Sequence, residues 1–177
     1  SNNDNVTVDA RNANGCSKTS SGVVITVFDL PTGTLAATEN SGIADDNAIC
    51  PGTNVLFTAT AGFSNYDFKV NGIMVQNGDA NTFNSSSLTN GASVTVDVTN
   101  ANGCISSFGP VIITVNPLPG GVLTFLENSG NLSNDGIICA GANVNFTAPA
   151  GFANYDFKVN GTTVQSGVSN IYNSTTL

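Results

Sequence analysis

Residues 94–104 read VTVDVTNANGC, and residues 6–16 read VTVDARNANGC, 88 positions earlier. A second pair of stretches repeats at nearly the same distance: ICPGTNVLFTATAGFSNYDFKVNG at 49–72 and ICAGANVNFTAPAGFANYDFKVNG at 138–161. A period of this length corresponds to one small domain per repeat. The sequence therefore predicts tandem domains of about 88 residues, of which this chain is a section.

Alternation of apolar and polar residues predicts that each repeat is all-β. Val94, Val96 and Val98 alternate with Thr and Asp, as expected for a strand with one buried face. No stretch has a sustained helical period. Strands are expected near 34–38, at 54–61, 66–70, 73–76, near 82–88, and at 93–100 and 110–115. Seven short strands with frequent turns favour a β-sandwich, with a small barrel as the alternative architecture.

Turn residues and prolines predict where the strands and the domains end. Asn71-Gly72 and Asn102-Gly103 are each expected to form a two-residue hairpin turn, in which both central residues have positive φ. Pro31, Pro117 and Pro119 indicate short, semi-rigid joints between repeats. We therefore expect the end of one repeat in residues 1–28, a complete repeat in 29–117, and the first strands of another repeat in 118–177.

The two partial repeats are not expected to cover their own apolar faces. Residues 1–28 would supply only the last hairpin of a domain, and residues 118–177 only its earlier strands. Both would expose sheet edges. We expect them to be completed by flanking repeats or by a neighbouring copy of the chain through strand donation.

Charge and composition exclude several classes of function. The net charge is −8, and only four residues are Lys or Arg. A nucleic-acid partner requires a basic face, so that class is excluded, and an anionic membrane surface is disfavoured. The sequence contains no apolar run long enough to span a membrane. We expect it to be mature or internal sequence, because no signal peptide is recognisable in it.

The four cysteines occupy equivalent positions in the repeats, Cys16 with Cys104 and Cys50 with Cys139. There is no histidine and no CxxC pair, so disulfides in an oxidising, extracellular compartment are favoured over zinc. Cys50 could pair with Cys104, but the predicted strand order places these residues at opposite ends of the sandwich. Alternatively, the cysteine that precedes the second strand of one repeat bonds to the turn cysteine of the next. Free thiols are a third possibility.

Acidic residues gather in one connection of each repeat. Glu39, Asp45 and Asp46 lie in the first copy, and Glu127 and Asp135 in the second. They are candidate calcium ligands that could stiffen a joint. The alternative is an Asx-rich turn that caps its own backbone. No other cofactor is indicated.

The remaining candidate chemistry points away from an enzyme. Nucleophilic catalysis lacks a histidine base, and no pair of carboxylates has the separation that glycoside hydrolysis requires. A Lys–Asn isopeptide bond would need a buried lysine, whereas Lys69 and Lys158 are predicted to face outward beside Asp67 and Asp156. Phe63 and Phe152 could contact a glycan at a domain tip or could close the core as a lid.

The pattern NPLP…ENSG…ICxGxxVxFTA…YDFxVNG…VTVxVTNANGC resembles the Ig-like or PKD-like repeats of giant surface proteins of the Bacteroidetes. The likeness covers nearly the whole chain and is greatest to the SprB-type gliding-motility adhesins. It implies tandem immunoglobulin-like β-sandwiches in an elongated array. It also implies export by the type IX system and display at the outer membrane.

The resemblance implies a structural and adhesive role. The repeats would form a stiff, multivalent stalk, with neighbouring repeats or head-to-tail copies as partners and an external surface or glycan as the target. The alternative function is a set of Ig-like accessory modules of a large secreted glycan-active enzyme. Dozens of further repeats in the parent protein would favour the adhesin, and a catalytic domain would favour the enzyme.

Overall fold

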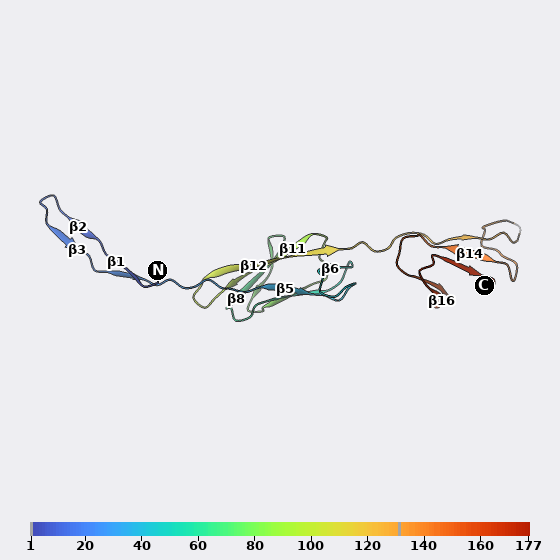
Figure 1. Cartoon of the computed structure of the whole chain (residues 1–177), viewed down its shortest axis with the longest axis horizontal. Coiled ribbons are helices and arrows are strands. Elements are labelled where there is room, and N and C mark those ends of the chain that lie inside the picture. The colour runs from blue at the N-terminus through green and yellow to red at the C-terminus, as the bar shows by residue number, and fades with distance from the viewer. Residues whose placement is uncertain (1, 131) are drawn as a thin grey trace. The chain divides into compact units, whose positions relative to one another are not determined.

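The structure is a computed structural model that describes residues 2–130 and 132–177 (Figure 1). Every regular element in these residues is a β-strand, as the alternation predicts. The described part of the chain accordingly has no helix that could cross a membrane. The chain divides after Pro117 into two compact units.

The intact repeat in the first unit consists of two sheets. The first sheet has the order β10-β7-β5, and the second has the order β6-β12-β11-β8-β9. The strands of the first sheet are β5 (Leu35–Thr38), β7 (Val55–Ala59) and β10 (Thr82–Ser85). Those of the second are β6 (Ala48–Ile49), β8 (Asn65–Val70), β9 (Ile73–Gly78), β11 (Ala92–Thr99) and β12 (Ile105–Val115). All pairings are antiparallel except that of β6 with β12.

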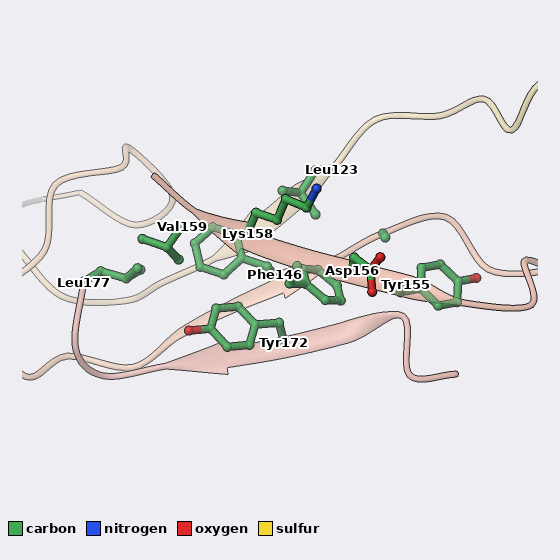
Figure 2. Close-up of a pocket in the computed structure, with 10 residues that line it drawn as sticks. Leu123, Phe146, Tyr155, Asp156, Lys158, Val159, Tyr172 and Leu177 are labelled. Atoms are coloured by element: carbon green, nitrogen blue, oxygen red, sulfur yellow. The ribbon is translucent and has the colours of Figure 1, made fainter. Parts of the chain in front are cut away.

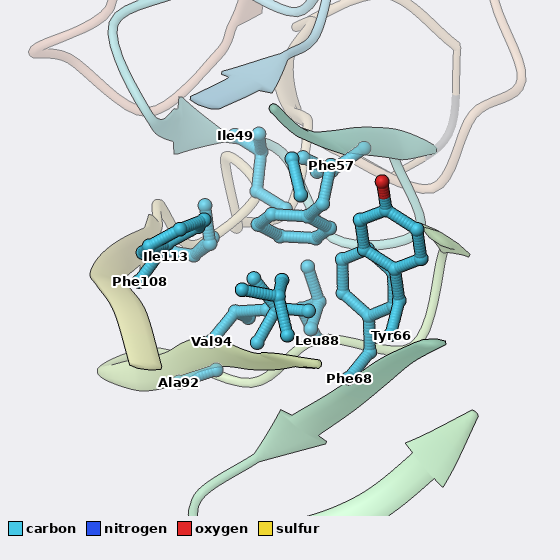
Figure 3. Packing of buried hydrophobic residues seen from close by; sticks show 13 residues of the cluster. Ile49, Phe57, Tyr66, Phe68, Leu88, Ala92, Val94, Phe108 and Ile113 are labelled. Carbon is cyan, nitrogen blue, oxygen red and sulfur yellow. The ribbon is translucent and has the colours of Figure 1, made fainter. Parts of the chain in front are cut away.

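The core of this repeat lies between the two sheets, where side chains from both meet (Figure 3). In β11 each residue from Ala92 to Val98 at an even position is buried, because successive side chains point to opposite faces of a strand. Phe57 comes from the facing sheet, and Phe83 packs with its ring centroid 5.9 Å from that of Phe57 and 5.7 Å from that of Phe68. The sandwich-like, half-buried pattern predicted from the sequence is confirmed.

The first 28 residues form a separate hairpin ribbon. Its strands are β1 (Asp4–Val6), β2 (Asp9–Arg11), β3 (Ser17–Thr19) and β4 (Val23–Ile25). β1 pairs with β4 and β2 with β3, all antiparallel, and every strand residue is exposed.

The second unit has five strands: β13 (Thr124–Leu126), β14 (Val144–Thr147), β15 (Tyr155–Val159), β16 (Thr162–Gly167) and β17 (Ile171–Ser174). They form the sheets β13-β14-β17 and β15-β16. These strands are the sequence equivalents of β5, β7, β8, β9 and β10. The described residues of this unit contain no equivalent of β11 or β12.

Two local predictions need correction, and one short strand was missed. Asn71 and Gly72 have the expected φ of 51° and 79°, but at the second site only Gly103 has positive φ. That turn is wider, because the Asn100 side chain accepts hydrogen bonds from two backbone N–H groups within it, those of Asn102 and Cys104, at 3.0 Å each. β12 also begins at Ile105 rather than 110. The short strand β6 was not predicted, since its two residues form a strand only by pairing in parallel with β12.

We expect Phe57→Ala to lower the free energy of unfolding by about 3–5 kcal/mol, because it leaves a cavity in a close-packed core. Phe57 is fully buried, whereas Ile73 is 72% exposed. Ile73→Ala is therefore the matched control and should change stability by no more than about 0.5 kcal/mol. Urea denaturation monitored by circular dichroism measures both. Similar losses for the two variants would contradict this packing.

Candidate functional site

The acidic connection of each repeat is organised around one buried glutamate. The Glu39 carboxylate accepts hydrogen bonds from the backbone N–H groups of Ser41 at 2.8 Å and Asp46 at 3.3 Å. Asp45 in turn accepts one from the Glu39 N–H at 3.0 Å, and Asp46 accepts one from the Ala48 N–H at 2.8 Å. The loop thus uses its carboxylates to bind its own backbone.

The second unit repeats this loop almost bond for bond. Glu127 accepts hydrogen bonds from the N–H groups of Ser129 at 3.0 Å and Asp135 at 2.9 Å. Asn134 takes the place of Asp45 and accepts a bond from the Glu127 N–H at 2.9 Å. Among the residues that the structure describes, no three acidic, Cys or His side chains gather as a metal site. The carboxylates of all five calcium candidates accept hydrogen bonds from backbone N–H groups of their own turn, as in the alternative of an Asx-rich capping turn.

The Ser41 backbone N–H holds the pKa of Glu39 below its ordinary value of 4.5, although desolvation opposes the shift. A lowered folded-state pKa stabilises the fold above the unfolded value, and this stabilisation is lost as the pH falls through the folded pKa. We expect Glu39→Gln to be less stable than wild type at neutral pH and to lose less stability on acidification. Urea midpoints across this range measure the effect, with the exposed Asp79→Asn as control. A wild-type pH dependence in Glu39→Gln would contradict the assignment.

The lysines lie outside the core, as expected, but the partner of Lys69 differs from the prediction. Lys69 forms an ion pair with Asp97 of the neighbouring strand β11 rather than with Asp67 of its own strand. The hydrogen bond to Asp97 raises the pKa of Lys69, and despite desolvation, bonds from Lys69 and Ser107 lower that of Asp97. The sequence pattern already placed Asp97 on the outward face of its strand. Identifying Asp97 as the partner of Lys69 also required the knowledge that β8 pairs with β11.

The phenylalanines considered as glycan contacts pack on the end of the core. The ring centroid of Phe63 lies 6.1 Å from that of Tyr66 and 5.8 Å from that of Phe108. The hydroxyl of Tyr66 also accepts a hydrogen bond from the Phe63 N–H at 3.1 Å. Phe152 repeats the tyrosine contact, at 6.1 Å from Tyr155, and remains 37% exposed. Phe63 is therefore a lid on the core.

The two cysteines of the intact repeat lie at opposite ends of β12. Cys104 directly precedes Ile105, the first residue of that strand. Cys50 directly follows Ile49, which pairs with Val115 at the other end. Ten residue steps of strand separate these ends by roughly 30 Å, whereas a disulfide allows at most ~7 Å between Cα atoms. A Cys50–Cys104 bond is thus incompatible with this fold, and all four cysteines are unpaired in the structure.

Each cysteine instead lies at one end of the repeat. Cys104 Sγ is 4.0 Å from the carbonyl oxygen of Phe28, in the segment that enters the repeat. Ile49, the neighbour of Cys50, accepts a hydrogen bond from the N–H of Asn116, in the segment that leaves it, at 2.8 Å.

The second unit carries an open apolar groove of about 230 Å³ (Figure 2). The rings of Phe146, Tyr155 and Tyr172 lie along it, with Leu177 at one end. Leu177 is 51% exposed, whereas its equivalent in the intact repeat, Leu88, is 8% exposed. The groove therefore occupies the place of a core that is closed in the intact repeat.

The sequence matches no protein-family model and no curated protein sequence.

We expect no Cys50–Cys104 peptide when the monomeric chain is oxidised with a glutathione redox buffer, because the fold holds the two thiols apart. Peptide mapping by mass spectrometry without reduction measures this, and the same oxidation in denaturant serves as the positive control. A stoichiometric Cys50–Cys104 bond in the folded monomer would contradict the strand order.

Proposed function

We propose that the chain is a section of a tandem immunoglobulin-like array that serves as a stiff, multivalent stalk in a large cell-surface adhesin, most closely of the gliding-motility type. The array would be extracellular, exported by the type IX system and displayed at the outer membrane. Its role is mechanical and adhesive rather than catalytic. The observation that carries the proposal is the recurrence of one domain in closely matching detail along a single chain.

The strand order supports an immunoglobulin-like domain. The sheets β10-β7-β5 and β6-β12-β11-β8-β9 correspond to the orders E-B-A and A′-G-F-C-C′ of immunoglobulin domains. The acidic turn and the tyrosine contact recur in the second unit with the same hydrogen bonds. Such repetition is typical of extended arrays, in which each domain adds length and one further copy of the same surface.

The pairing of β6 with β12 supports a mechanical role. β12 runs directly into the joint at Pro117, and its last residues are held by β6 in parallel. The N–H groups of Thr114 and Asn116 donate to the carbonyls of Asn47 and Ile49 at 2.9 and 2.8 Å. Tension on the joint would load these bonds across their axes, since ladder bonds run across the strands. Several bonds would then have to break together.

The end positions of the cysteines support covalent clamping of the joints. One thiol at each end of a repeat allows the cysteine before the second strand of one repeat to bond to the turn cysteine of the next. Each bond would form by thiol–disulfide exchange with a disulfide donor in the extracellular compartment, which takes up the two electrons released with two protons. Such bonds would stop successive repeats from separating under load.

Antibody labelling of living cells tests the function. A fluorescent antibody against residues 29–117 should label the surface of the cells that produce the chain, and the signal should travel along gliding cells. Label that is fixed in place would refute the motility role. Label found only in the medium would favour the secreted modules of a glycan-active enzyme.

Single-molecule force spectroscopy tests the mechanical role. We expect Asn116→Pro to lower the unfolding force of the intact repeat, because proline lacks the N–H that bonds to Ile49. The loss in equilibrium stability should be only about 1 kcal/mol. Asn116→Ala keeps the N–H and is the matched control. An unfolding force that is equal in both variants would show that the β6–β12 pairing bears no load.

A further inference from the structure

The segment that enters the intact repeat is bound to the turn of residues 100–104. The side-chain amide of Asn100 donates a hydrogen bond from Nδ2 to the carbonyl oxygen of Asp29 at 3.0 Å. In the same turn, Cys104 Sγ lies 4.0 Å from the carbonyl oxygen of Phe28. Both acceptors are backbone carbonyls, which every residue carries. The contact therefore does not depend on the side chains of the entering segment.

Asn100 can hold this segment because the turn itself fixes the orientation of its side chain. Its Oδ1 accepts hydrogen bonds from the N–H groups of Asn102 and Cys104 at 3.0 Å each. The backbone of Asn100 is fixed as well, since its carbonyl oxygen accepts a bond from Ser64 Oγ at 3.1 Å. An amide whose oxygen is bound twice presents its N–H donor in one direction. The donor is thus preorganised for the carbonyl of Asp29.

The same turn occurs in both copies of the sequence NANGC, at 12–16 and at 100–104. Asn12 accepts hydrogen bonds from the N–H groups of Asn14 and Cys16 at 3.0 Å each, the equivalents of the two bonds to Asn100. The repeat sequence therefore places an asparagine amide at this position each time. In a tandem array, a feature that recurs with the repeat acts once at every joint.

The segment that leaves the intact repeat is the sequence equivalent of the one that enters it. Asn116 and Pro117 follow Phe28 and Asp29 by 88 positions. The N–H of Asn116 donates to the carbonyl oxygen of Ile49 at 2.8 Å. The preceding repeat thus binds the N–H of the first residue of this dipeptide, and the following repeat binds the carbonyl of the second. A proline at the second position is compatible with this arrangement, because it keeps its carbonyl acceptor.

We propose that the turn of residues 100–104 is the docking surface for the last two residues of the preceding repeat, and that Asn100 is the residue that fixes them. Each joint then contains no residue that lacks a hydrogen bond to one repeat or the other. Pro31 is buried two residues after Asp29, which continues the hold into the repeat. Such a joint restricts bending between successive repeats. The inference goes beyond the proposed function, because it requires only tandem repeats and makes no use of adhesion or of the joint disulfides.

Backbone ¹⁵N relaxation of the full chain, with a thiol reductant present, tests the contact. In the wild type the order parameter of Asp29 should be about 0.85, the value of rigid backbone. Asn100→Asp keeps oxygens that accept the N–H groups of the turn, but it lacks the N–H donor and places a carboxylate beside the Asp29 carbonyl. We expect the order parameter of Asp29 to fall below about 0.6. Asn12→Asp makes the same change in the equivalent turn and is the matched control, which should leave Asp29 unchanged.

Limited proteolysis measures the same contact independently. Phe28 is 50% exposed, so chymotrypsin can reach its side chain, but cleavage after Phe28 requires the backbone to leave the turn. We expect Asn100→Asp to raise the rate of this cleavage at least about fivefold, because one hydrogen bond is lost. Asn12→Asp should leave the rate unchanged.

Urea midpoints verify that both variants are folded. If Asn100→Asp is not folded, Asn100→Ser replaces it, because a serine hydroxyl can accept a turn N–H but is too short to reach Asp29. An order parameter of Asp29 below about 0.6 in the wild type would overturn the proposal. Equal cleavage after Phe28 in the folded Asn100 variant and in Asn12→Asp would also overturn it.

Discussion

Strand β11 is the element on which the intact repeat depends. It is hydrogen-bonded to β8 on one side and to β12 on the other, and β12 in turn holds β6. Its inward side chains, Val94, Val96 and Val98, are completely buried between the sheets. Its outward Asp97 anchors Lys69 of β8. One strand thus joins its sheet, fills the core and orders a charged pair on the outer face.

The second unit, of which this chain contains only the earlier strands, shows which parts of a repeat form from local sequence. Phe57 is fully buried in the intact repeat, but its equivalent Phe146 is only half-buried and lines an open groove. The dipeptide that corresponds to β6, at 137–138, forms no strand, and Ile137 is 68% exposed. The local structures that both units share are held by hydrogen bonds between residues close in the sequence. They are the acidic turn, the Asn160-Gly161 hairpin and the hydrogen bond between Tyr155 and Phe152. Local sequence therefore specifies the turns, whereas in the intact repeat the core is built from strands far apart in the sequence, with the β11–β12 hairpin among them.

Most of the strands could be predicted because apolar and polar residues alternate along a strand that has one buried face, as in Val94–Val98. β6 could not be predicted, since two residues are too few to show an alternation, and they form a strand only because they pair with β12. The wide turn at Asn100 was missed because the decisive acceptor is a side chain two residues before Asn102. The ion pair of Lys69 depends on which strands are neighbours. The prediction that Cys50 and Cys104 lie far apart needed only the strand order, and the structure places them accordingly.

Hydrogen–deuterium exchange of the full chain tests most directly the claim that the last hairpin closes each core. In residues 1–177, amides of β15 should exchange much faster than their equivalents in β8, which has two bonded neighbours. Protection of β15 that equals that of β8 would contradict the account.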